Sequence, residues 1–230
     1  MSRERFKVMH NVFDEFTNRA LFTLISAGHF DGLQSPISIG KEANIFSAKK
    51  GSESVVVKIY RLESCDFNRM YDYIKFDPRY STVHPSKRKI IFAWAQREYR
   101  NLLKAREGGV RVPKPITFRH HILVMEHIGK RQPAPKLKDA WPQDAEAFLQ
   151  DIALQMRKLH RAGLVHADLS AFNILNHEER PVIIDLSQCT TLEDSRAAEY
   201  LQRDIKNVAT FFQKRGIAAA EAELRERIIR

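Results

Sequence analysis

Three polar residues in the second half of the chain have the types and the spacing that phosphoryl-transfer chemistry requires. Asp168 and Asn173 lie five positions apart, and Asp185 follows twelve positions after Asn173, at the end of the apolar run 181–184. An ionised carboxylate such as Asp168 can accept the proton of a substrate hydroxyl. An amide oxygen and a second carboxylate are ligands that Mg²⁺ takes together with phosphate oxygens and water. We therefore expect Asp168 to be the catalytic base, and Asn173 and Asp185 to bind the metal.

The stretch His-Ala-Asp-Leu-Ser-Ala-Phe-Asn-Ile-Leu at 166–175 has the Asp-to-Asn spacing of a kinase catalytic loop. An Asx-rich turn without a catalytic role is the alternative. The second acid after an apolar strand favours catalysis, because two matches in the expected order are more specific than one. We interpret His166 as a packed residue that organises the backbone, not as a base.

Lys58 lies within the apolar run 55–60, where a lone buried charge would be costly without a partner or an anionic ligand. Glu98 falls on the apolar stripe of a predicted helix, one turn after Trp94 and one turn before Leu102. An edge-strand lysine and a purely structural ion pair are the alternatives. Given the downstream motif, we favour a Lys58–Glu98 pair that orients the phosphates of ATP, as in protein kinases.

The segment Ser-Ile-Gly-Lys-Glu-Ala at 38–43 lies between two predicted strands, upstream of Lys58. With one glycine it fits a plain hairpin turn as well as a loop that covers phosphates. Its position favours the second interpretation, so we expect Ser38, Gly40 and Lys41 to contact ATP.

Composition narrows the class of protein. The chain has 230 residues, a formal charge of +10 and 43% hydrophobic residues, which suits one globular domain with an anionic partner such as nucleotide phosphates or RNA. General solubility explains the charge equally well. Cys65 and Cys189 form neither a metal-ligand spacing nor a disulfide framework, which favours a reducing cytoplasm. We find no apolar run long enough for a membrane span and no signal segment, so we expect no membrane association.

Apolar periodicity and turn residues predict the elements. We expect helices at residues 14–27, 89–107, 143–162, 195–215 and 218–229, strands at 35–39, 45–48, 54–60, 116–119 and 122–127, and two short strands beside the 166–175 stretch. Residues 61–86 mix aromatic, charged and hydroxyl side chains, and we interpret them as a flexible loop without regular structure. Within it we expect autophosphorylation at one of four residues: Ser64, Ser81, Thr82 or Ser86.

A strand-rich part with one internal helix, followed by a helix-rich part, predicts an α+β fold with two lobes. We expect a single domain over 1–230, with an N-lobe at about 1–126 and a C-lobe at about 127–230. We also expect Met125, Glu126 and Ile128, at the lobe boundary, to contact ATP.

On these motifs the chain resembles the RIO family of atypical protein kinases, from about residue 15 to the end. The stretch 166–175 and the run Ile-Ile-Asp-Leu-Ser-Gln at 183–188 are RIO-like, with Asp-Leu-Ser-Gln replacing the Asp-Phe-Gly of ordinary protein kinases. The loop 38–44 is similar to that of the RIO-one subfamily, which usually has Thr where Ile39 stands. Ser-Thr-Val-His-Pro at 81–85 is similar to that subfamily too.

The resemblance implies a trimmed kinase fold with an extra N-terminal helix. Only 45 residues follow Asp185 and no Ala-Pro-Glu element appears, which implies that the activation segment and the peptide-docking helices are absent. It further implies a serine/threonine protein kinase and ATPase that uses Mg²⁺ or Mn²⁺. Phosphate would go to serine, to the enzyme itself, or to the Asp185 carboxylate as an intermediate. The small ribosomal subunit precursor and its RNA are the implied partners, and an archaeal origin is expected.

Two other functions share part of the pattern. A small-molecule kinase of the aminoglycoside or choline type has the same Asp-to-Asn spacing, although Ser170, the loop 38–44 and the basic stretch 81–89 argue against it. A nucleotide-gated module that binds RNA or the ribosome without catalysis is the third interpretation.

Basic side chains gather around the helix at 89–107, and we expect its flank to bind ribosomal RNA. The residues are Lys87, Arg88, Lys89, Arg97, Arg100, Lys104 and Arg106. Helical periodicity places Arg97, Arg100 and Lys104 away from the Trp94 and Glu98 stripe. A merely solvated face is the alternative.

Overall fold

The computed structural model describes residues 13–80 and 82–230 and divides the chain into two compact units. Among the described residues, the first unit comprises 13–71, 83–99 and 115–127, and the second comprises 72–80, 82, 100–114 and 128–230. The fold is α+β, as the sequence predicts. No helix within the described residues combines the length and the apolarity needed to cross a membrane.

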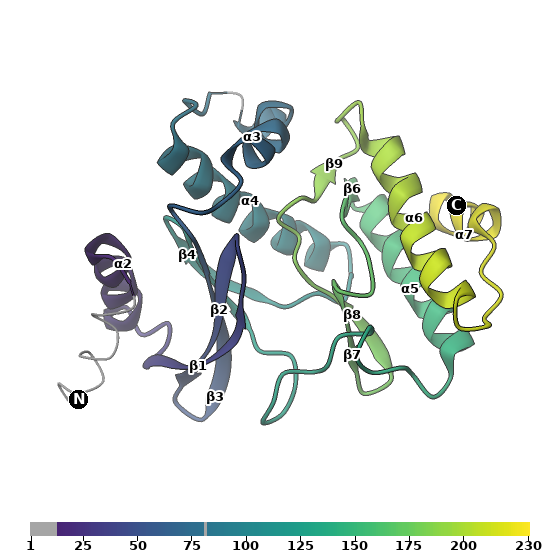
Figure 1. Cartoon of the computed structure of the whole chain (residues 1–230), viewed down its shortest axis with the longest axis horizontal. Coiled ribbons are helices and arrows are strands. Elements are labelled where there is room, and N and C mark those ends of the chain that lie inside the picture. The colour runs from purple at the N-terminus through teal and green to yellow at the C-terminus, as the bar shows by residue number, and fades with distance from the viewer. Residues whose placement is uncertain (1–12, 81) are drawn as a thin grey trace. The chain divides into compact units, whose positions relative to one another are not determined.

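The first unit is built on a five-stranded antiparallel sheet in the order β1-β2-β3-β5-β4 (Figure 1). The strands are β1 Gly32–Ile39, β2 Ala43–Lys50, β3 Glu53–Tyr60, β4 Pro115–Arg119 and β5 Ile122–Glu126. The central strand β3 places Lys58 opposite Ile45 on one side and Leu123 on the other. Lys58 is therefore not an edge-strand lysine, and its main chain is fixed by pairing on both sides.

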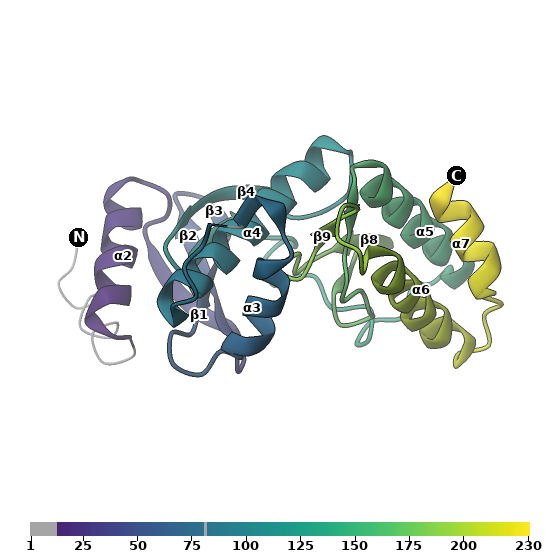
Figure 2. The ribbon, with the colours of Figure 1, turned by 90° about the horizontal axis from the view of Figure 1, so that it is seen from above.

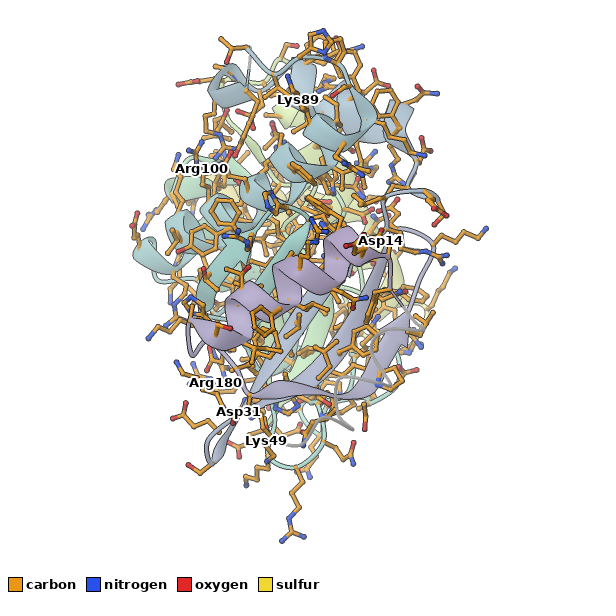
Figure 3. The ribbon with its side chains drawn as sticks, turned by 90° about the vertical axis from the view of Figure 1, so that its left-hand side faces the viewer. Asp14, Asp31, Lys49, Lys89, Arg100 and Arg180 are labelled. Atoms are coloured by element: carbon orange, nitrogen blue, oxygen red, sulfur yellow. The ribbon has the colours of Figure 1, made fainter. Side chains whose placement is uncertain are left out.

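Helix α2, Glu15–Ser26, lies across the face of this sheet, with Asp14 at its start (Figure 3). The Asp14 carboxylate accepts a hydrogen bond from the Thr17 amide at 2.7 Å, which satisfies one of the free amides of the first turn. Leu21 and Leu24 are buried in the core that the helix shares with the strands. Gly28, with a φ of 74°, ends the segment in the left-handed conformation that glycine adopts most readily.

Helix α4, Lys87–Glu107, buries the predicted stripe of Ile91, Trp94, Ala95 and Leu102 together with Glu98. The prediction that Arg97 lies on an exposed flank that could bind RNA is wrong, because its side chain is 0% exposed and its guanidinium lies 5.4 Å from the centre of the Trp94 ring. Helix α4 is buried over a wider arc than one apolar stripe indicates.

On the rest of that flank, Arg100 is exposed and Lys104 is half-buried. The side chains of Lys89 and Arg100, both from α4, are labelled in Figure 3. A basic surface on this helix therefore has to be formed without Arg97.

The expectation that residues 61–86 lack regular structure is also wrong. They contain helix α3, Phe67–Lys75, and a 3-10 turn, Pro78–Tyr80. Apolar side chains recur at positions 67, 70, 71 and 74, which is the spacing of a helix face, and Met70, Tyr73 and Ile74 are buried. Ser81, one of the expected phosphorylation sites, lies outside the described residues.

The second unit contains three helices that pack together at the C-terminal end of the chain, α5 Ala145–Arg161, α6 Ala197–Gln213 and α7 Glu221–Ile229 (Figure 2). Two small antiparallel ladders accompany them, β6 Leu164–Val165 with β9 Thr190–Thr191, and β7 Ile174–His177 with β8 Arg180–Ile183. Residues 186–196 hold only β9 and turns, so this part of the described chain has no long activation segment. These ladders flank the 166–175 stretch.

Candidate active site

The loop that carries Asp168 and Asn173 runs from β6 to β7 and is fixed through its main chain. The imidazole Nε2 of His166 lies 3.0 Å from the carbonyl oxygen of Ile184, and Ala167 has a φ of 66°. A non-glycine residue in the left-handed region costs roughly 1 kcal/mol or more and persists only where its surroundings impose it. His166 thus ties the loop to the strand end before Asp185, as the sequence interpretation of a packed organiser requires.

Asp168 is half-buried and hydrogen-bonded by two amide side chains. The Nδ2 of Asn173 donates to the Asp168 carbonyl oxygen at 2.9 Å and lies 3.4 Å from its Oδ2, while the Nε2 of Gln188 donates to Oδ2 at 3.1 Å. These contacts fix the direction of the carboxylate. They also orient the Asn173 side chain with its nitrogen toward Asp168, which leaves its oxygen directed elsewhere.

Asp185 is brought to the same loop by the main chain. The Ile184 amide donates to the carbonyl oxygen of Asn173 at 3.0 Å, so Asp185 follows directly after a contact with the other expected ligand. Asp185 has a φ of 60°, and the Ser187 hydroxyl donates to its Oδ1 at 2.7 Å. The left-handed backbone and the hydrogen bond from Ser187 together hold the Asp185 carboxylate in one orientation. Residues with such strained backbone conformations cluster at functional sites.

Asp204, on α6, is a residue that the sequence argument missed. Its carboxylate accepts hydrogen bonds from the amides of Ala167 and Leu169, both at 2.8 Å, and its side chain is buried. These two amides flank Asp168, so one carboxylate fixes the main chain on both sides of the expected base. Burial raises the pKa of Asp204 to about 6, although the two amides and the neighbouring cations act in the opposite direction.

Two neighbours of Asp204 complete the anchor. Arg203 donates to the carbonyl oxygen of Ala167, and Asn207 donates through Nδ2 to the carbonyl oxygen of Leu169 at 3.1 Å. Helix α6 therefore satisfies both main-chain amides and both carbonyls around Asp168. Asp204 could have been found from the sequence as an acid on the apolar face of a predicted helix, which is how Glu98 was identified.

In the first unit, Lys58 and Glu98 form the expected ion pair. The Nζ of Lys58 lies 2.9 Å from Oε1 of Glu98, and the two residues are 4% and 1% exposed. Tyr60 donates its hydroxyl to the other carboxylate oxygen of Glu98, and the Lys58 ammonium lies 5.1 Å from the centre of the Tyr60 ring. The glutamate is thereby satisfied through both oxygens, and the lysine is held in one place.

The loop 38–43 is a hairpin turn, with Ser38 paired to Ile45 and the Gly40 amide donating to the Ala43 carbonyl at 3.0 Å. A Cβ at Gly40 would lie 3.1 Å from that carbonyl oxygen, so a larger residue would crowd the turn. Ser38 and Lys41 are exposed and Gly40 is half-buried. A hairpin is compatible with phosphate binding, and contact of these three residues with ATP stays a prediction.

The segment after β3 holds this turn from the other side. The Arg61 amide donates to the Glu42 carbonyl at 2.9 Å, and the Ser64 hydroxyl donates to the Lys41 carbonyl at 3.0 Å. Cys65 adds a contact from its sulfur to the Glu42 carbonyl at 3.1 Å, and burial raises the pKa of its thiol to about 11. The start of the segment 61–86 is therefore attached to the expected nucleotide loop.

The remaining expected ATP contacts lie at and after the end of β5. Met125 is buried opposite Val56, and Glu126 is exposed opposite Val55. Ile128 is half-buried and packs in the second unit against a small apolar cluster of Ala134, Leu175 and Val182. Their contact with ATP also stays a prediction.

The donor set at the catalytic loop fits a hard cation. Asn173 and Asp185 offer an amide oxygen and a carboxylate, and the described residues contain no group of three or more His, Cys, Asp or Glu able to hold a metal. Mg²⁺ and Mn²⁺ take oxygen ligands, and Mg²⁺ usually keeps several waters and substrate phosphates, so two protein ligands suffice. A closed zinc site would require four nitrogen or sulfur ligands, which these residues do not provide.

Comparison with known proteins identifies the family of the chain. The RIO domain family matches residues 44–225. The RIO-type serine/threonine-protein kinase Rio1 of Haloferax volcanii is 42% identical over 218 residues, which cover 94% of this chain and 75% of that protein. The enzyme of the same name from Methanocaldococcus jannaschii is 40% identical over 93% of this chain and 74% of its own length. Human serine/threonine-protein kinase RIO1 is 36% identical over 91% of this chain and 38% of its own length.

Solved structures show the same fold. The crystal structure of the Rio2 kinase–ADP/Mg²⁺–phosphoaspartate complex from Chaetomium thermophilum matches with a TM-score of 0.71 and 24% identity, covering 92% of this chain and 66% of that one. The crystal structure of the Rio2 kinase from the same organism matches with a TM-score of 0.73. At this identity the likeness concerns the fold.

Proposed function

The chain belongs to the RIO family and is an atypical serine/threonine protein kinase, and we propose that Asp168 is its catalytic base. In this mechanism Asp168 accepts the proton of an acceptor serine as the hydroxyl oxygen bonds to the γ-phosphorus of ATP, and the bond to ADP breaks. The observation that supports this role is the pair of side-chain amides, from Asn173 at 3.4 Å and Gln188 at 3.1 Å, that orient the Oδ2 atom of the carboxylate.

We propose that Asn173 and Asp185 hold Mg²⁺ or Mn²⁺, and that Lys58 binds phosphate oxygens. When bound, the cation supplies positive charge that offsets the charge of the phosphates. Lys58 is held in place by its ion pair with Glu98, so that it reaches the nucleotide with one orientation. Ser38, Gly40, Lys41, Met125, Glu126 and Ile128 complete the proposed ATP contacts.

The test of the base is a comparison of Asp168→Ala with Asp168→Asn. Phosphate transfer to serine should fall by about 100-fold or more in both variants, since general base catalysis contributes on that order. ATP affinity, measured by fluorescent-nucleotide displacement, should change little. Transfer that persists at the wild-type rate in either variant would rule out Asp168 as the base.

We further propose that Asp185 can itself receive the phosphoryl group when no serine is present. A carboxylate oxygen bonds to the γ-phosphorus as the bond to ADP breaks, and water then hydrolyses the aspartyl phosphate to release inorganic phosphate and restore the carboxylate. The hydrogen bond from Ser187 and the left-handed backbone hold this carboxylate in one orientation, which suits a nucleophile. Acid-quenched enzyme should then contain phosphate that hydroxylamine releases. Label that is stable to hydroxylamine would assign the phosphate to a serine instead.

We propose that the enzyme acts in the cytoplasm on precursors of the small ribosomal subunit, with the particle and its RNA as partners. The formal charge of +10 supports binding to a polyanion. ATP hydrolysis measured with and without precursor particles, in the wild type and in Asp168→Ala, tests this. Stimulation by particles that vanishes in the variant is expected, and equal rates with and without particles would contradict the assignment. If the protein were only a ribosome-binding module, the wild type and Asp168→Ala would bind particles equally well and hydrolyse ATP at the same rate.

Because Arg97 is buried, the expected RNA contact has to be made by the other basic residues of this helix. Exposed basic residues remain near the start of α4 and further along it, at Lys87, Arg88, Lys89, Arg100 and Arg106. Lys89→Glu with Arg100→Glu should weaken particle binding and reduce its salt dependence, because each lost phosphate contact removes released counterions. Glu107→Gln, at an exposed acid of the same helix, is the control.

We propose autophosphorylation within residues 61–86. Ser64 and Thr82 are exposed and Ser86 is half-buried. Mass spectrometry after incubation with ATP tests this, and phosphate found only elsewhere would contradict it. Phosphorylation of Ser64 would remove its hydrogen bond to the Lys41 carbonyl, so this site would be coupled to the nucleotide loop.

A further inference from the structure

A short segment of the second unit runs beside the catalytic loop and is fixed to it through the main chain. The Asn176 amide donates to the Pro135 carbonyl at 2.8 Å, and the Leu137 amide donates to the Ile174 carbonyl at 2.8 Å. The Lys138 amide donates to the carbonyl of Ala171 at 3.2 Å. Lys138 is therefore held next to the residues that connect Asp168 to Asn173.

Phe172 lies within this loop and is 58% exposed, although it is one of the larger apolar side chains of the unit. The ammonium of Lys138 lies 5.4 Å from the centre of its ring. An exposed ring contributes little to the folded core, and an exposed cation–π contact is worth only about 0.5–1 kcal/mol. Folding alone thus gives no reason for a phenylalanine between the base and the metal ligand.

The charge of Lys138 is only partly offset by its neighbour. Its Nζ lies 2.5 Å from Oδ1 of Asp139, and both residues are exposed. An ion pair in water contributes little, and an ammonium has three hydrogens to donate. Lys138 can therefore bind a second anion without giving up its place on the Phe172 ring.

We propose that Phe172 and Lys138 form an acceptor-selecting surface that favours serine-bearing peptide segments with an acidic and an apolar side chain close to the serine. The inference rests on the proposed role of Asp168, which needs the acceptor hydroxyl within hydrogen-bonding distance. An extended peptide advances about 3.3 Å per residue. Residues within about three positions of that serine then pass over the loop that holds Phe172, where Lys138 meets the acidic side chain.

The experiment compares three peptides, each with a single serine. They differ only at the position two residues from that serine, which is glutamate, glutamine or lysine. Each peptide also has a leucine next to the serine. The measured quantity is the ratio of kcat/KM for the glutamate peptide to that for the glutamine peptide. Because this ratio is taken within each enzyme variant, a general loss of turnover or of folded protein cancels.

Wild type should favour the glutamate peptide by about fivefold, the effect of one exposed ion pair. Lys138→Glu should reverse the order and favour the lysine peptide, and Phe172→Ala should raise KM for all three. Lys214→Glu, at an exposed lysine after α6, should keep the wild-type ratio. A Lys138→Glu ratio equal to that of wild type would overturn the proposal.

Failure of this inference is distinguishable from failure of the proposed function. If ATP turnover depends on Asp168 but no peptide is phosphorylated, or all three are phosphorylated equally, the acceptor surface is wrong and the base assignment stands. If turnover and autophosphorylation do not depend on Asp168, the base assignment is wrong, and the proposed acceptor surface, which rests on it, is wrong as well. If RNA inhibits the enzyme through Lys138 and the glutamate peptide does not compete with that RNA, the surface binds nucleic acid, and the proposal is overturned.

Discussion

Lys58 of β3 and Glu98 of α4 come within 2.9 Å of each other, although forty residues separate them in the chain. Both are almost fully buried, so neither charge is stabilised by water. Removing one partner of a buried pair leaves the other charge uncompensated, which typically costs about 3 kcal/mol or more. Tyr60, which also donates to Glu98, should reduce that cost.

We predict that Lys58→Met lowers ATP turnover by about 100-fold or more, because the phosphates lose a preset positive charge. Its unfolding free energy should fall by about 3 kcal/mol or less, which leaves the protein folded. Steady-state turnover and urea unfolding measure the two effects. Lys49→Met, at an exposed lysine of β2, is the control, and a folded Lys58→Met enzyme with unchanged turnover would contradict the assignment.

Asn173→Ala and Asp185→Asn should each raise the Mg²⁺ concentration for half-maximal activity by about tenfold or more, because each removes an oxygen ligand. Binding of Mn²⁺ to the enzyme with a non-hydrolysable ATP analogue, followed by electron paramagnetic resonance, measures the same loss without turnover. Glu193→Gln removes an exposed acid from the same region and should change neither quantity. Equal Mn²⁺ affinity in wild type and variants would refute the metal assignment.

His121 should make the first unit sensitive to acid. It is buried with its Nε2 2.9 Å from the Thr17 hydroxyl, and burial lowers its pKa to about 4. Because the folded-state pKa lies below the usual 6.5, the stability that this group contributes is complete above about 6.5 and is lost as pH falls toward 4. The loss should approach about 3 kcal/mol.

Urea unfolding at several pH values tests this, with His121→Gln as the variant. The stability difference between wild type and His121→Gln should shrink as the pH is lowered through that window. His84→Gln, at an exposed histidine, should follow the wild-type profile. A constant difference between wild type and His121→Gln would show that His121 does not titrate in this way.

Asp204 should give the opposite pH dependence. Burial raises its pKa to about 6, above the ordinary carboxyl value of 3.8. Its contribution to stability is therefore complete below about 3.8 and is lost as pH rises through about 6, by roughly 3 kcal/mol in total. The stability of wild type relative to Asp204→Asn should decline over that range, while Glu199→Gln on the same helix should show no such decline.

Asp204→Asn should also lower kcat, because an amide group has one oxygen and can no longer accept from both Ala167 and Leu169. KM for ATP should change less, since the side chain of Asp204 is buried and binds the main chain of the loop. An unchanged kcat would show that the loop keeps its shape without this carboxylate.

The residues that could be assigned from sequence are those whose chemistry shows in their type and local spacing. The Asp168-to-Asn173 interval and the acid on the α4 stripe can be recognised in a single sequence. The strands of the first unit can be predicted from runs of β-branched residues between glycines. The left-handed backbone at Ala167 and Asp185 is not visible, because neither residue type requires a positive φ.

The errors have physical causes. Helix α3 was missed because the prolines and the mixed composition of residues 61–86 were given more weight than the helical spacing of its apolar side chains. Arg97 was misplaced because one apolar stripe was taken to be the whole buried surface of α4. Asp204 was missed because it binds main-chain amides, and those partners leave no signature in the sequence.

The anchoring of the Asp168 loop by α6 has a consequence for synthesis. A nascent chain that has been translated only as far as Asp185 already contains every expected catalytic residue, yet it lacks Asp204. The Ala167 and Leu169 amides have no carboxylate to bind until α6 has left the exit tunnel. Active geometry should therefore arise only after α6 has emerged, so that chains interrupted before that point do not consume ATP.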